Sequence, residues 1–294
     1  MENDNLLNQT VKFPTSQDKI TSQHESNRSQ LSSHRIKLHH LGIRLVTEFL
    51  TTTCLVFIGC LGMRSGSLFF GAVAMGMFVS AMIASFAHIS GAHFNPAITL
   101  GFTIARQINR IDACAYVIVQ MLASVFGAFL VWLLVAEHVY LSINGGCNYW
   151  DANAISIYQA SILEAIAAAI LVLFVLKLAV DLPEQTAGPF AVGILVATLI
   201  ATFGDLSGAS LNPARSFGPM VIYSAVRMMK NSTVPKSLNN DSEIYLMPKQ
   251  IWQHSHLYLV SPMLGALVAS VIYRVIFANW SKIDKQASNL RKKD

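Results

Sequence analysis

The chain has 294 residues, of which 53% are apolar and only 13% are charged. A soluble domain carries about 25% charged residues, so this composition excludes a disordered, collagen-like or nucleic-acid-binding chain and argues against a soluble enzyme. The 21 Lys and Arg exceed the 16 Asp and Glu by five, and most charges lie at the two ends or in short gaps between apolar runs. This distribution is typical of a membrane protein with basic flanking segments.

Residues 1–40 are polar, rich in Ser, Gln, Asn and His, and contain no long apolar run. We therefore expect a disordered tail here and no cleaved signal peptide.

Six apolar runs come close to the roughly 20 residues that a helix needs to cross a bilayer. They lie near 41–62, 68–88, 112–136, 156–180, 187–204 and 256–278. Two further apolar stretches, 95–106 and 212–226, are too short to span. Each opens with an Asn that can cap a helix, followed by Pro at the first helical position. These two stretches predict half-length helices that enter the membrane and stop there.

The basic residues orient the spans, because Lys and Arg concentrate in cytoplasmic loops. They gather in the N-terminal tail, in the gap at 106–110 and in the tail at 281–294. An even number of spans places both ends on one side, so we expect both termini to be cytoplasmic. An insertion at about 227–255 would then be extracellular, where its sequons at Asn231 and Asn240 are candidate glycosylation sites.

An internal repeat divides the chain into halves at about 41–145 and 146–280. The octapeptide SGAHFNPA at 90–97 recurs as SGASLNPA at 207–214, and an intramembrane Glu precedes each copy at a similar distance, Glu48 before the first and Glu164 before the second. Because each half holds three spans, an odd number, the second half must lie upside down relative to the first. Inverted repeats of this kind place a shared pathway at the membrane midplane, where broken helices meet.

The two predicted half helices would therefore meet N-terminus to N-terminus near the middle of the membrane. Each N-terminus carries about half a positive charge from the helix dipole, and each presents an Asn side chain, Asn95 or Asn212. A small neutral solute could offer its oxygen to both amides. A water molecule held in this way cannot relay a proton along the file, and the positive helix ends repel cations.

Four charged or titratable residues deserve separate interpretations. Arg215 follows the second Asn-Pro-Ala box, where an intramembrane charge predicts a pore function; the alternative is an arginine that extends to the lipid headgroups. Glu48 and Glu164 would accept hydrogen bonds from loop N–H groups and support the half helices, although a proton or ion relay stays open. His93 would orient its loop or line the vestibule. We expect no metal site and no cofactor, because no ligand set surrounds this histidine.

The paired boxes with the following arginine resemble those of the major intrinsic protein family, the aquaporins and aquaglyceroporins, over about 41–280. The resemblance implies an all-α membrane fold with six transmembrane helices and two re-entrant half helices, assembled as a homotetramer with one pore per subunit. It also implies the exclusion of protons and cations that aquaporins achieve at their half-helix ends. The residues that match the signature boxes are Asn95, Pro96, Ala97, Asn212, Pro213 and Ala214.

Arg215 matches the arginine of the family's selectivity filter, and alignment around the boxes assigns Met75, Ile200 and Ala209 to its other positions. A strict water channel usually has an aromatic residue, a His and often a Cys there, so this filter is expected to be wider and less polar. The glycerol-conducting branch usually has Asp directly after the Arg, whereas this chain has Ser216. The resemblance is greatest to the animal branch that passes ammonia and hydrogen peroxide as well as water, with urea and glycerol as further candidates.

Two other functions stay open as alternatives. An ion channel or ion-coupled transporter would need paired acids or a carbonyl filter within the pathway, and a structural or junctional protein would adhere to a second membrane. No motif predicts an enzyme. The resemblance implies a multi-pass protein of the plasma membrane, with an intracellular membrane as the alternative.

Overall fold

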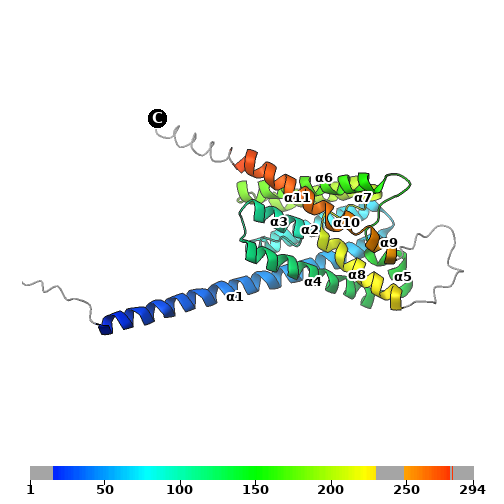
Figure 1. Ribbon diagram of the computed structural model, residues 1–294. Helices are drawn as coiled ribbons and strands as arrows, with labels where there is room; N and C mark the ends of the chain where they lie inside the picture. Colours follow the sequence, from blue (N-terminus) through cyan, green and yellow to red (C-terminus); the bar gives the residue numbers. More distant parts are fainter. Residues whose placement is uncertain (1–15, 230–247, 279, 281–294) are drawn as a thin grey trace, which may run out of the picture. The chain divides into compact units, whose positions relative to one another are not determined.

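The computed structural model describes residues 16–229, 248–278 and 280, and within these ranges every regular element is helical. Figure 1 shows their arrangement. The α-helices are α1 (Ser16–Gly62), α2 (Leu68–Ser90), α3 (Pro96–Ile104), α4 (Arg110–Leu134), α5 (Glu137–Ser142), α6 (Ile157–Leu176), α7 (Gly188–Ser207), α8 (Pro213–Met229), α9 (Pro248–Gln253), α10 (His256–Leu259) and α11 (Ser261–Ile272). Four short 3-10 or π-helical turns accompany them: η1 (Met63–Ser65), η2 (Asn144–Gly146), η3 (Lys177–Asp181) and η5 (Tyr273–Phe277).

The prediction of a disordered tail over residues 1–40 is wrong for its second part, because α1 already begins at Ser16. Residues 16–41 contain neither Pro nor Gly. Extending a helix costs much less than nucleating one, so nothing in this polar segment stops the helix that the apolar run establishes. The chain forms two compact units, Met1–Ile43 and Arg44–Asp294, and the contacts described below lie within the second unit.

The six predicted membrane spans are confirmed. Each is long and apolar enough to cross a bilayer, and their bounds are Ile36–Gly62, Leu68–Ser90, Arg110–Leu134, Ile157–Asp181, Gly188–Ser207 and His256–Phe277. The outward surfaces of these helices carry large apolar side chains such as Phe69, Leu133, Phe190 and Val275, as lipid contact requires. The short helix α5 and the turn η2 precede the fourth span and were not predicted.

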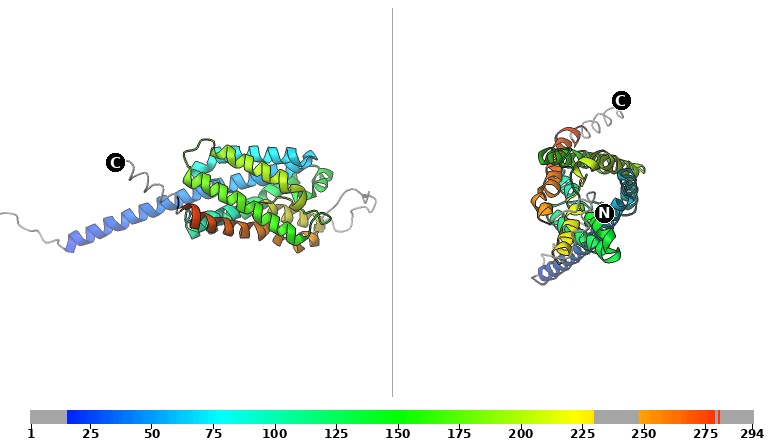
Figure 2. Two further views of the ribbon diagram at one scale, coloured as in Figure 1. Left: turned by 90° about the horizontal axis from the view of Figure 1, so that it is seen from above. Right: turned by 90° about the vertical axis from the view of Figure 1, so that its right-hand side faces the viewer.

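The half helices α3 and α8 have nine and 17 residues, both below the length of a span. Helix α3 packs against α11, the last span of the second half, and α8 packs against α4, the last span of the first half. The remaining large contacts, between α2 and α7 and between α6 and α11, place spans of the second unit side by side (Figure 2). Each half therefore contributes the short helix that the other half holds.

The loop before each half helix has the same backbone conformation in both halves. Gly91 and Gly208 end α2 and α7 in the left-handed region, with φ of 87° and 91°. Ala92 and Phe94 in the first loop, and the corresponding Ala209 and Leu211 in the second, also have positive φ. Residues with a Cβ adopt this conformation at a cost, so other contacts must stabilise both loops.

The expected insertion at about 227–255 is helical at both ends, because α8 continues to Met229 and α9 begins at Pro248. Asn231 and Asn240, the candidate glycosylation sites, lie outside the described residues, as does the tail at 281–294.

Candidate functional site

Both asparagines of the repeated box cap their half helices. The Asn95 side-chain oxygen accepts a hydrogen bond from the backbone N–H of Ala97 at 2.8 Å. The Asn212 oxygen accepts from the N–H groups of Ala214 and Arg215 at 2.9 and 3.3 Å. Pro96 and Pro213 are the first residues of α3 and α8, where the missing N–H has no intrahelical partner to lose.

The side-chain amides of the two asparagines cross between the halves. Asn95 Nδ2 donates to the carbonyl of Leu211 at 3.0 Å, and Asn212 Nδ2 donates to the carbonyl of Phe94 at 2.9 Å. Each amide has two N–H groups, and one is used in this exchange. Both asparagines also line one cavity. The structure thus brings the two boxes together through reciprocal contacts.

Glu48 lies on α1, fully buried behind the first loop. Its carboxylate accepts hydrogen bonds from the N–H groups of His93 and Phe94 at 2.9 and 2.7 Å, and from the Ser90 hydroxyl at 2.8 Å. A fourth donor is the side-chain amide of Gln120 on α4, at 2.8 Å. One of these bonds reaches Phe94, whose positive φ is otherwise unfavourable, and the Ser90 hydroxyl in turn accepts from the N–H of Ala92, the other residue of this loop with positive φ. Gln120 was not singled out in the sequence, because no motif marks it.

Glu164 on α6 occupies the corresponding place behind the second loop and is also fully buried. Its carboxylate accepts from the N–H groups of Ser210 and Leu211 at 3.0 and 3.1 Å and from the Ser207 hydroxyl at 2.7 Å. These three donors match those of Glu48 position by position, and Gln120 is a further donor to Glu48.

His93 is buried beneath the first loop and does not line the cavity. Its Nδ1 lies 3.2 Å from the hydroxyl of Thr99 on α3. The ring also packs against Phe102 and Tyr116, with centroid distances of 4.6 and 5.4 Å. Of the two interpretations of His93, these contacts favour orientation of the loop.

A cavity of about 700 Å³ runs past both boxes and is lined mainly by apolar side chains. Besides Asn95 and Asn212, its walls include all four residues assigned to the filter: Met75, Ile200, Ala209 and Arg215. Met75 and Ile200 come from α2 and α7, Ala209 from the second loop, and Arg215 from α8. Residues far apart in the sequence therefore meet at one cavity wall.

Arg215 is buried, yet its guanidinium is held by backbone carbonyls. Nη1 donates to the Gly146 carbonyl at 2.8 Å, and Nη2 donates to the Gly59 carbonyl at 3.2 Å. Nη2 also lies 3.5 Å from the Met63 sulfur. These partners fix the direction of the guanidinium, and neither ion pair of the described residues includes Arg215. They favour the pore interpretation over an arginine that extends to the lipid headgroups. The sequence contains no signal for Gly59 and Gly146, because they act through backbone carbonyls, which every residue type has.

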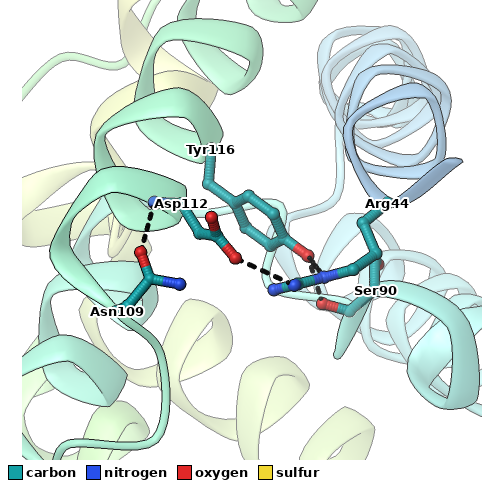
Figure 3. A network of polar contacts seen from close by, with 5 residues as sticks. All are labelled: Arg44, Ser90, Asn109, Asp112 and Tyr116. Atoms are coloured by element: carbon teal, nitrogen blue, oxygen red, sulfur yellow. Dashed lines mark hydrogen bonds and ion pairs between the residues drawn. The ribbon is translucent and has the colours of Figure 1, made fainter. Parts of the chain in front are cut away.

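A second polar network, which the sequence did not reveal, contacts the end of α2 just before the first loop (Figure 3). The hydroxyl of Tyr116 donates to the Ser90 carbonyl at 2.9 Å and accepts from Arg44 Nε at 2.7 Å. Arg44 also forms an ion pair with Asp112 at 3.0 Å. Arg44 lies within the first apolar run, four residues before Glu48, and that unusual position was the available signal. Among the residues that the structure describes, no group of three His, Cys, Asp or Glu could hold a metal ion.

Comparisons with known proteins agree with this geometry. The family model for major intrinsic protein matches residues 37–273. Aquaporin AqpM of Methanothermobacter marburgensis is 29% identical over 206 residues, which cover 69% of this chain and 75% of the relative. Aquaporin-8 of Rattus norvegicus is 34% identical over 187 residues, covering 60% and 69% respectively.

Among solved structures, the aquaglyceroporin from Plasmodium falciparum has the same fold. It superposes with a TM-score of 0.63 and 22% sequence identity, covering 83% of this chain and 99% of that one. Six membrane spans, two short re-entrant helices and a cavity along the ends of those two helices are together typical of a membrane channel. The chain belongs to the major intrinsic protein family.

Proposed function

We propose that the chain is a passive channel for water and small neutral solutes, ammonia and hydrogen peroxide among them, with urea and glycerol as further candidates, and that it excludes protons and cations. The observation that carries this proposal is that Asn95, Asn212 and Arg215 line the same cavity. The names of the relatives, which include aquaporins and a propanediol uptake facilitator from Citrobacter freundii, point to the same class of transport.

The paired asparagines supply the first barrier. Each has a side-chain N–H left over from the exchange with the opposite loop, and each stands at the positive end of a helix dipole. A passing solute accepts hydrogen bonds from both amides. Because its oxygen is then fully used as an acceptor, a water molecule here cannot accept a proton from its neighbour, and a cation meets two electropositive helix ends.

The filter supplies the second barrier and the choice of solute. Arg215 repels cations and donates hydrogen bonds, while Met75, Ile200 and Ala209 offer apolar walls. A filter with one polar side chain places few hydrogen-bonding demands on a solute. Such a wall suits small neutral molecules that differ in shape, rather than water alone.

Glu48 and Glu164 support this passage without entering it. Every oxygen of both carboxylates accepts at least one hydrogen bond from loop or side-chain donors. Neither residue lines the cavity. Their paired state favours a supporting role over a proton or ion relay, which would need a carboxylate that meets the pathway.

We further infer a homotetramer in the plasma membrane with both termini cytoplasmic. The basic residues between α3 and α4 and the apolar outer faces of the spans support the orientation and the bilayer setting. No enzymatic activity forms part of the proposal.

The test is a stopped-flow panel on purified protein in proteoliposomes, run with water, ammonia, peroxide, urea and glycerol, beside a voltage-clamp recording. We expect osmotic and solute fluxes above those of empty vesicles, without current. A voltage-dependent current would support the ion-channel alternative. Near-zero permeability together with adhesion between vesicles would support the junctional one.

A further inference from the structure

A second pocket, of about 750 Å³, lies away from the channel, between the end of α3, the start of α4 and the turn η5. Three arginines line it: Arg106 and Arg110 from the segment between the half helix and the third span, and Arg274 from η5. Their side chains are exposed. Three positively charged side chains from distant parts of the sequence therefore line the same pocket.

None of the described residues that line this pocket is acidic. The nearby carboxylate of Asp112, in the first turn of α4, forms its ion pair with Arg44. The carboxylate of Asp181 forms an ion pair with Lys177 at 2.5 Å. It also accepts a hydrogen bond at 2.7 Å from the hydroxyl of Tyr273, the first residue of η5. In the part of the chain that the structure describes, neither ion pair involves an arginine of the pocket. Among the described residues, no acidic side chain pairs with the three arginines, so the pocket carries a net positive charge there.

The helix geometry adds to this charge. Helix α4 begins at Arg110, and its 25 residues direct the positive end of their dipole toward the pocket. The cap residue Asn109, whose side chain accepts from the Asp112 N–H at 2.9 Å (Figure 3), also lines the pocket. An anion here would meet both the guanidinium groups and the N–H groups of the first turn.

The position of the pocket indicates where the anion comes from. Arg110 is the first residue of its span, and Arg274 lies in the last turn of the span that ends at Phe277. Both arginines thus lie where helices leave the apolar layer, at the height of lipid headgroups. Guanidinium groups bind phosphate oxygens through paired hydrogen bonds, and anionic lipids attract arginines at this level.

We propose that this pocket binds the phosphate of an anionic lipid headgroup. The site is distinct from the channel and independent of the solutes that pass through it. Because α3 ends at Ile104 on the wall of the same pocket, a bound headgroup also braces the half helix that carries Asn95 at its other end.

The experiment measures binding to the purified full chain in neutral detergent by native mass spectrometry and by thermal shift. The probes are dioctanoyl phosphatidic acid, dioctanoyl phosphatidylcholine and inorganic phosphate. The variants are Arg106→Gln, Arg110→Gln, Arg274→Gln and their combination, with Arg274→Lys as the charge-preserving variant. Arg64→Gln serves as the matched control, because Arg64 is an exposed arginine in η1 that does not line the pocket.

We expect phosphatidic acid to bind and to raise the melting temperature, and phosphatidylcholine to do neither. Each single Gln variant should weaken binding about fivefold, and the triple variant about 100-fold. Arg274→Lys should keep most of the affinity, and Arg64→Gln all of it. Retained water flux of the variants in proteoliposomes checks that they fold.

Three results would overturn the proposal. Equal loss in Arg64→Gln would mean that any surface arginine attracts the lipid. Equal binding of the two lipids would remove the role of headgroup charge. Binding of inorganic phosphate as strong as that of phosphatidic acid, with the same dependence on the arginines, would assign the pocket to a free anion instead.

Discussion

Replacing Arg215 with valine tests the charge barrier most directly. In the wild-type structure the guanidinium covers the carbonyls of Gly146 and Gly59, which accept its hydrogen bonds at 2.8 and 3.2 Å. The variant removes one positive charge from the cavity wall and leaves two carbonyl oxygens without these donors. The electrostatic character of the wall therefore changes from repelling cations to attracting them.

The size of the change follows from Coulomb's law. Two unit charges of the same sign at about 4 Å repel by about 4 kcal/mol when the effective dielectric constant is about 20. Since about 1.4 kcal/mol corresponds to a factor of ten, losing the charge should raise proton or cation leakage by up to about 1,000-fold. The dipoles at Asn95 and Asn212 are unchanged and keep part of the barrier.

The assay follows proton entry into proteoliposomes with an enclosed pH-sensitive dye under a valinomycin-set potential, together with osmotic shrinkage in the same preparation. Arg215→Lys is the matched control, because it keeps the charge but cannot hold both carbonyls in the same way; its leakage should stay near that of the wild type. If Arg215→Val conducts water and leaks no more than wild type, the assignment of the cation barrier to Arg215 is wrong.

Three further predictions concern the filter, the loop support and the helix packing. Ile200→His replaces an apolar side chain of the cavity wall with a polar ring and narrows the cavity there, so ammonia or peroxide flux measured by stopped flow should fall more than water flux. Equal losses would refute the assigned solute selectivity. Glu48→Ala leaves two buried loop N–H groups without an acceptor, and at about 1–3 kcal/mol for each the free energy of unfolding in detergent should fall by about 2–6 kcal/mol, whereas an unchanged value would contradict the supporting role. Gly193→Ala places a Cβ against the Gly76 carbonyl on α2, closer than van der Waals contact allows, so thermal unfolding should show that the free energy of unfolding falls by about 1–3 kcal/mol or more. On the same helix, Gly188→Ala meets no atom within 4 Å and should be close to neutral; equal effects of the two would argue against close packing of α2 and α7.

The sequence predicted the features that depend on local pattern and on the repeat. Six apolar runs determine six spans, and an Asn-Pro pair determines each half-helix start, because capping and the missing proline N–H act within a few residues. The meeting of Asn95 with Asn212 followed from the inverted repeat, although the particular exchange with the Leu211 and Phe94 carbonyls did not. That exchange depends on the left-handed backbone of both loops, which no residue type between the glycine and the asparagine indicates.

The contacts that sequence reasoning missed are long-range and use groups without a sequence signature. The carbonyls of Gly59 and Gly146 hold Arg215 across separations of 156 and 69 residues. The bonds of Tyr116 to Arg44 and Ser90 likewise join residues on three helices. The helical extension of α1 was missed for a different reason, since its composition is that of a solvated tail and only the absence of helix breakers favours the helix.

The two halves of the chain differ at the position of the charged residue that lines the cavity. The repeated residues make the common framework: two glutamates, two left-handed loops and two capping asparagines. The position that corresponds to Arg215 in the first half is Ile98, which also lines the cavity but carries no charge. Because only the second half has the arginine, we expect the charged barrier to lie to one side of the asparagine pair rather than at the centre of symmetry. Under the proposed function, the repeated framework determines where the pathway runs, and the departure from symmetry determines which end of the pathway selects by charge.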